Sequence, residues 1–224
     1  TGLAALLSGE IDFIQPIPLQ DVDQVEGREG FKVLEGEETR VIMFGFGHEH
    51  DTLLYSSDVT DANPFTDPRV RLAAAHAIDI DSIDRVLFRG KIEAANQLVP
   101  AGISGYSEAN QNRPAYDPDR ARELLAEAGY PNGFSFGLKC TNDRYINDES
   151  ICQAAVGMMG QIGINVTLDA KPKAQHFPFI KGGDSDFYML GWGVPTFDSH
   201  YIFNFLVHSR TGDRGSWNPT GYSD

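Results

Sequence analysis

Segments of strand type and helix type alternate from residue 134 to residue 193, and this order leaves few folds open. The strand segments are short and rich in β-branched and aromatic residues, and a helical segment follows each of the first two. In chain order, the strands and helices alternate over 134–140, 148–163, 164–170, 174–183 and 186–193. Strands joined by crossover helices pair in parallel. The sequence therefore predicts an α/β fold with a mostly parallel sheet and helices on both faces.

The first half of the chain is expected to add shorter elements. Their apolar patterns predict helices at 1–8 and 19–26 and strands at 11–15, 31–37 and 39–48. Three further helices have clear start signals, because an aspartate stands just before the first turn of each. The capping residues are Asp67, either Asp79 or Asp81, and Asp117.

The balance of charge restricts the partners of the chain. It has 32 Asp and Glu residues against 18 Lys and Arg, a formal net charge of −14. Nucleic-acid binding needs clustered basic residues that release counterions, so no nucleic-acid partner is expected. No stretch approaches the roughly 20 consecutive apolar residues that would span a bilayer. The sequence starts within a helix and ends in a polar turn, so we expect a fragment of a longer protein.

The polar run "LKCTNDRYINDES" sets Arg144 between the end of a strand and the start of a helix. In a parallel sheet, ligands lie outside the carboxyl ends of the strands. A guanidinium pairs bidentately with a carboxylate, and a helix N-terminus adds free N–H groups and partial positive charge. Arg144 is therefore a candidate carboxylate anchor. The alternative is an ion pair with its own neighbours Asp143 or Asp148.

A second strand end, "GWGVPTFDSHYIF", combines glycines, aromatic residues and one acid. Gly193 would let the backbone approach a ligand closely. An apolar wall for that ligand would consist of Trp192, Phe197 and Tyr201, with Asp198 as a charged post. The alternative is a core tryptophan followed by a helix that Asp198 caps, and both interpretations can hold together.

The cysteines and histidines leave alternatives open. Cys140 and Cys152 are either a disulfide, contributing about 3 kcal/mol, or two buried free thiols. In "GHEH", His48 and His50 share one face of a strand, and a third ligand, such as His200 or His208, is not identifiable. Motifs of nucleophilic or metal-dependent catalysis, a Walker loop and a G-x-G-x-x-G that opens a helix are all absent. An enzyme is not expected, and no cofactor is implied.

The order of several segments resembles a known family. These segments are "NPFTDPRVRLAAAHAIDIDSI", "YDPDRARELLAEAGYPNGFSF", "NDRYINDESICQAAVGMMGQIGINVTLDA" and "DFYMLGWG". Together they resemble the extracytoplasmic solute-binding proteins of peptide and nickel ABC importers, family 5. The resemblance implies a type II periplasmic-binding-protein-like lobe, with residues 1–39 as the tail of a first lobe and 40–224 as an incomplete second lobe.

The family resemblance also implies a role. A periplasmic or lipid-anchored monomer would bind a small peptide or peptide-like solute between two lobes and deliver it to the membrane permease of the importer. Nickel or a metal chelate is the alternative solute within the same importer class.

Single residues carry this resemblance further. Arg144 matches the arginine that dipeptide-binding members place against the carboxylate of the ligand. The aspartate that binds the ligand's amine usually stands three residues after the tryptophan, where this chain has Pro195, and Asp198 is the nearest acid. A modified peptide, an opine-like compound or another small carboxylate is therefore an alternative to a plain peptide. In an oxidising compartment, a bridge between Cys140 and Cys152 would hold Arg144 in place.

Overall fold

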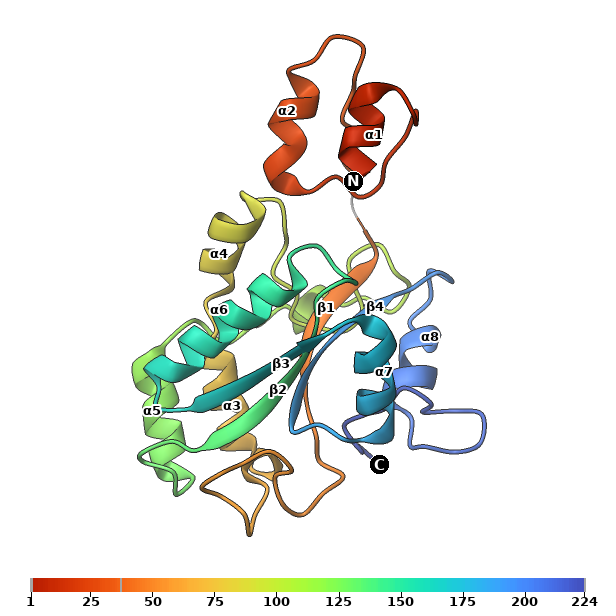
Figure 1. The fold of residues 1–224 in the computed structure, drawn as a ribbon. Coiled ribbons are helices and arrows are strands. Elements are labelled where there is room, and N and C mark those ends of the chain that lie inside the picture. Colours follow the sequence, from red (N-terminus) through yellow and green to blue (C-terminus); the bar gives the residue numbers. More distant parts are fainter. Residues whose placement is uncertain (1, 37, 224) are drawn as a thin grey trace.

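The computed structural model describes residues 2–36 and 38–223 and is built on a four-stranded sheet (Figure 1). The strand order is β1-β4-β2-β3, where β2 pairs in parallel with both β3 and β4, and β1 is antiparallel to β4. The strands are β1 (Arg40–Phe46), β2 (Ser135–Thr141), β3 (Asn165–Lys171) and β4 (Phe187–Gly193). The predicted mostly parallel sheet is confirmed, with β1 as its antiparallel edge.

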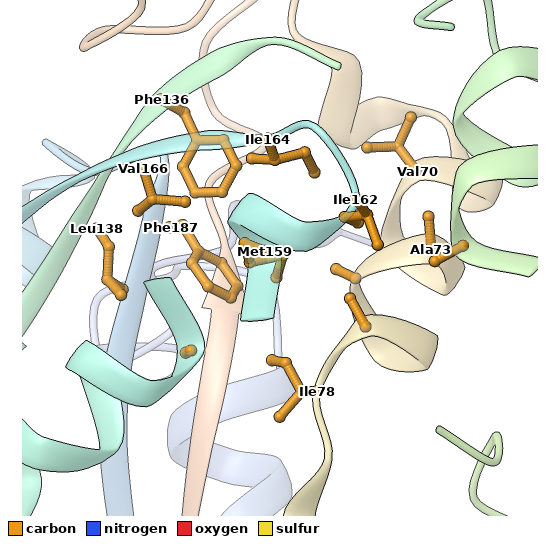
Figure 2. Close-up of a cluster of buried hydrophobic side chains, with 14 of the residues drawn as sticks. Val70, Ala73, Ile78, Phe136, Leu138, Met159, Ile162, Ile164, Val166 and Phe187 are labelled. Carbon is orange, nitrogen blue, oxygen red and sulfur yellow. The ribbon is translucent and has the colours of Figure 1, made fainter. Parts of the chain in front are cut away.

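Three helices cover one face of this sheet. They are α3 (Pro68–Ala77), α5 (Pro118–Glu127) and α6 (Asp148–Gln161). Figure 2 shows how Phe136 and Leu138 of β2 and Phe187 of β4 meet Met159 of α6, all of them almost inaccessible to solvent. This is the larger of the two hydrophobic clusters, and it holds α6 against β2.

The other face carries a second, smaller core. It is covered by α7 (Lys173–Gly182), by α8 (His200–Ile202) and by the π-helical turn η5 (Phe203–Val207). Side chains along β4 alternate between the two clusters, so that Phe187 and Met189 face the first and Tyr188 and Leu190 face the second. The prediction of helices on both faces is therefore confirmed.

The aspartate caps lie where the sequence places them. The side chain of Asp67 accepts a hydrogen bond from the Arg69 N–H at 2.8 Å, and that of Asp117 accepts from Arg120 N–H at 2.9 Å. Asp79, and not Asp81, caps the next helix by accepting from Ser82 N–H. The remaining short elements are α4 (Ile80–Ile83), η2 (Pro64–Thr66), η3 (Asp84–Phe88) and η4 (Glu108–Asn110).

The N-terminal segment projects away from the sheet (Figure 1) and contains α1 (Gly2–Ser8), η1 (Leu19–Asp21) and α2 (Val22–Glu26). The predicted strands at 11–15 and 31–37 are wrong: residues 11–15 and 31–36 are irregular, and residue 37 lies outside the described residues. A strand needs a neighbour, and within the described part of the chain the four strands of the sheet pair only with one another. Apolar side chains of these stretches are consequently exposed, Phe13 to 70% and Leu34 to 75%.

Within 2–36 and 38–223, no helix has both the length and the hydropathy that crossing a membrane requires.

The sulfur atoms of Cys140 in β2 and Cys152 in α6 are joined as a disulfide, with their Cα atoms 6.7 Å apart. Both residues are fully buried in the larger cluster. The bond therefore links the carboxyl end of β2 to the first turns of α6, and Arg144 lies in the loop that it closes.

Replacing both cysteines with alanine is expected to lower the free energy of unfolding by about 3 kcal/mol, because a loop of this size restricts the unfolded chain by roughly that amount. Urea unfolding of the two proteins measures the difference. Unfolding the unmodified protein in the presence of a dithiol should reproduce the loss. An unfolding midpoint that does not respond to the dithiol would show that the bridge contributes nothing.

Candidate functional site

Three strand ends meet at the carboxyl edge of the sheet, which is the edge formed by the carboxyl ends of β2 and β4. Because β2 and β4 are parallel, their last residues, Thr141 and Gly193, lie at the same edge. The antiparallel β1 begins there, and its first residue, Arg40, is in register with Gly193. In α/β sheets this edge is where ligands bind.

Arg144 follows β2 at this edge and is exposed. The ion pairs of residues 2–36 and 38–223 do not include its guanidinium, whose carbon lies 5.2 Å from the centroid of the Tyr145 ring. The proposed pairing with Asp143 or Asp148 does not occur. Asp143 accepts a hydrogen bond from Lys173 N–H at 2.6 Å, and Asp148 accepts from the backbone N–H of Arg144 at 3.0 Å. The two acids shape the loop and leave the guanidinium to solvent.

The N-terminus of α6 is partly occupied by the chain itself. The buried carboxylate of Asp148 accepts hydrogen bonds from the N–H groups of Tyr145 at 3.1 Å and Glu149 at 3.0 Å. The helix therefore already has a negative charge at its positive end. This differs from the expected free N–H groups, because the Glu149 N–H already has an acceptor.

Sequence reasoning did not identify two further residues of this edge, Tyr145 and Arg40. The Tyr145 hydroxyl accepts a hydrogen bond from Gly191 N–H at 2.8 Å and donates one to Gly191 C=O at 3.1 Å. The Arg40 guanidinium carbon lies 5.7 Å from the centroid of the same ring. We call Arg40, Arg144 and Tyr145 the cationic corner.

Burial raises the pKa of the Tyr145 hydroxyl, although its hydrogen bond with Gly191 and the positive charges of Arg144 and Arg40 act in the opposite direction. Tyr145 is consequently neutral at pH 7. The hydroxyl therefore does not neutralise either guanidinium.

Trp192 lies on the face of β4 opposite to the one that the Tyr145 ring contacts. Its ring packs in the smaller core, 5.7 Å from the ring of Tyr201, so the structure brings together two of the three predicted wall residues. Phe205 and Trp217 complete the cluster at 6.0 and 5.8 Å from Trp192, and sequence reasoning did not identify them. The indole N–H of Trp192 is buried and has no partner among the residues that the structure describes.

Phe197 and Asp198 stand apart from this aromatic cluster, in the exposed loop after β4. Phe197 has a φ of +55° and is 62% exposed. One carboxylate oxygen of Asp198 accepts a hydrogen bond from His200 N–H at 2.8 Å at the start of α8, and the residue is exposed. Asp198 therefore stabilises the helix start, as expected, although Ser199 is the N-cap residue.

The histidines do not gather around one point. His48 Nε2 is buried without a partner in the described part of the chain, and burial, reinforced by the charge of Arg71, lowers the pKa of His48. The Nε2 atom of His50 lies 3.2 Å from the carbonyl oxygen of Gly183, and Nδ1 of His208 contacts the carbonyl of Ser209. Within residues 2–36 and 38–223, no three His, Cys, Asp or Glu side chains are placed to hold a metal ion.

Comparison with known proteins gives consistent results. The family profile described as "Bacterial extracellular solute-binding proteins, family 5 Middle" matches residues 1–214. The glutathione-binding protein GsiB of Pectobacterium atrosepticum is 30% identical over an alignment of 230 positions, which covers 100% of this chain and 42% of GsiB.

Two solved structures are similar over the whole chain. One is the periplasmic binding protein DppA from Helicobacter pylori in complex with the peptide STSA, with 26% identity, a TM-score of 0.75 and 41% of DppA covered. The other is the binding protein AgaA from A. tumefaciens R10 in complex with agropinic acid, with 28% identity, a TM-score of 0.72 and 43% of AgaA covered.

This chain therefore spans about two fifths of the length of these relatives. Their names describe binding proteins and not enzymes, and the fold is that of type II periplasmic binding proteins. The chain belongs to the bacterial extracellular solute-binding proteins of family 5.

Proposed function

We propose that this chain supplies the second lobe of an extracytoplasmic solute-binding protein that delivers a peptide or peptide-like carboxylate to an ABC importer permease. Residues 40–224 would form that lobe, and residues 1–39 would belong to the tail of the first. The observation that carries the proposal is the exposed Arg144 guanidinium, which no carboxylate of the described residues pairs with, at the carboxyl end of β2.

Arg144 is suited to an external anion for two reasons. The backbone around it is fixed by hydrogen bonds from the Arg144 and Tyr145 N–H groups to Asp148, so the base of the side chain is well defined. Although the chain has a net charge of −14, the acids nearest to Arg144 in the sequence, Asp143 and Asp148, are engaged with backbone N–H groups and do not pair with its guanidinium. A solute carboxylate that enters between two closing lobes would meet a charge-assisted, bidentate partner in a site that loses water.

Phe197 and Asp198 would contact other parts of the solute. The exposed Phe197 would provide apolar surface, whereas Trp192 and Tyr201 pack in the smaller core on the other face of the sheet from Tyr145 and would not reach a carboxylate at Arg144. Asp198 would accept a hydrogen bond from an ammonium group of the solute. Its side chain is exposed, and only one of its two oxygens accepts the hydrogen bond from His200 N–H. Pro195 cannot play that role, which favours a solute whose amine is modified or placed differently from that of a plain dipeptide.

The relatives support a carboxylate-bearing solute. GsiB is named for glutathione, and DppA was solved with a peptide. Both compounds carry at least one carboxylate, so glutathione and short peptides are the first solutes to test.

Arg144→Gln is expected to weaken binding of a carboxylate solute by about 2–4 kcal/mol, or roughly 30- to 1,000-fold, because the solute anion would be desolvated without a charged partner. Calorimetry on the full-length protein with glutathione and with trialanine measures the change. Arg122→Gln is the matched control, since Arg122 is an exposed arginine of α5 that pairs with Asp119. Equal affinities of the Arg144 variant and the unmodified protein for every carboxylate solute that binds would refute the proposal.

A further inference from the structure

A second guanidinium lies against the same aromatic ring as Arg144. Arg40 begins β1, and its register partner Gly193 has no side chain. The next residue on that face of β1 is Ile42. The Ile42 side chain and the Tyr145 ring both fill the space beside Gly191 that a Cβ atom there would need. Arg40, Gly193, Gly191 and Tyr145 therefore share one face of the sheet edge.

The geometry of the corner is fixed by Tyr145. Its hydroxyl is bonded to both the N–H and the C=O of Gly191, so the ring is held against β4. The guanidinium carbons of Arg144 and Arg40 lie 5.2 and 5.7 Å from the ring centroid, a distance at which cations are attracted to an aromatic ring. Two positive groups are thus placed around one rigid side chain in a strongly acidic protein.

The two cations are not equally free. Arg40 pairs with Glu38 at 2.8 Å, but the Glu38 side chain is 64% exposed and that of Arg40 26%. An ion pair with so exposed a partner is screened by water and contributes little, so a better-placed anion can replace Glu38. At Arg144 a solute carboxylate would displace no other anion, because no carboxylate of the described residues pairs with this guanidinium.

We propose that Arg40 is a specificity-determining residue of this site and that the cationic corner binds a solute with two carboxylates, one at Arg144 and one at Arg40. The inference rests on the proposed function and adds the charge of the solute to it. A solute with one carboxylate would pair with Arg144, and Arg40 would stay paired with Glu38. A second carboxylate on the solute would replace Glu38 as the partner of Arg40. The new ion pair would lie between the two lobes, where less water screens its attraction.

The test compares two tripeptides that differ only in one carboxylate, Ala-Ala-Glu and Ala-Ala-Gln. Calorimetry on the full-length protein should show that Ala-Ala-Glu binds at least about 10-fold more tightly. Arg40→Gln should remove this preference by weakening Ala-Ala-Glu alone, whereas Arg144→Gln should weaken both peptides. Glu38→Gln should tighten Ala-Ala-Glu a few-fold, because the competing carboxylate is removed. Arg122→Gln is the control and should change neither affinity.

The outcomes separate this inference from the proposed function. If Arg40→Gln keeps the preference, or the unmodified protein has none, the two-carboxylate solute is wrong, although the proposed function stands as long as Arg144→Gln weakens both peptides. If Arg144→Gln weakens neither, the proposed function itself fails. Failure of both peptides to bind contradicts both. Mass spectrometry of the solute that copurifies with the protein provides an independent check, and a solute with a single carboxylate would overturn the inference alone.

Discussion

Asp186→Ala is expected to lower the free energy of unfolding by about 3–5 kcal/mol, the largest effect on stability that we predict for one side chain. Asp186 is 3% exposed and accepts hydrogen bonds from three backbone N–H groups: Leu54 at 2.6 Å, Tyr55 at 2.9 Å and Gly137 at 3.3 Å. Alanine would leave these donors without an acceptor in a poorly hydrated place. Urea unfolding measures the loss.

Asp184→Ala is the matched control, because this exposed aspartate is two residues away on the same turn, and its loss should change stability by less than about 0.5 kcal/mol. The contacts of Asp186 lie at the amino ends of β2 and β4, opposite the cationic corner. At a temperature where the variant is folded, its solute affinity should therefore match that of the unmodified protein. A loss of stability no larger than that of the control would show that water or a rearranged loop replaces the carboxylate.

The sheet could be predicted because its signals are local. Aspartates cap α3 and α5, and the three parallel strands β2, β3 and β4 are separated by α6 and α7, helices of ordinary length. The strands expected at 11–15 and 31–37 had similar apolar patterns. Residues 11–15 and 31–36 are not strands because pairing depends on a neighbour elsewhere in the chain, which a local pattern does not report.

The candidate site could be predicted only in part for the same reason. Arg144 was identified because it directly follows a strand at the edge where ligands bind. Arg40 lies 104 positions earlier and reaches the corner only through its register with Gly193. Trp192 and Arg144 were expected to contact the same ligand from two strand ends, but alternation along β4 places Trp192 in the core on the other face from Tyr145. The face of the sheet that each side chain of β4 occupies is set by packing of the whole sheet.

Gly191→Ala is expected to damage the cationic corner more than any other change of one methyl group. A Cβ atom at this position would stand 2.5 Å from Cδ1 of Ile42 and 2.6 Å from Cε1 of Tyr145. The Tyr145 ring would have to move, and both hydrogen bonds between its hydroxyl and Gly191 would break. Overpacking of this kind costs about 1–3 kcal/mol, and solute affinity should fall by at least about 10-fold because the ring between the two guanidinium groups is displaced.

Gly157→Ala provides the control with the opposite sign. Gly157 is an exposed glycine within α6, and a Cβ there meets nothing within 4 Å, so alanine should stabilise the protein by roughly 0.5–1 kcal/mol and leave binding unchanged.

A double variant separates the role of Tyr145 in folding from its role in binding. In Gly191→Ala with Tyr145→Ala, the clash with the ring is gone, so part of the stability lost in Gly191→Ala alone should return. Solute affinity should stay low, because the side chain that both guanidinium groups lie against is absent. If affinity returned together with stability, the ring would matter only through its bulk. If neither returned, the clash with Ile42 would account for the damage, and the Tyr145 ring would not be its cause.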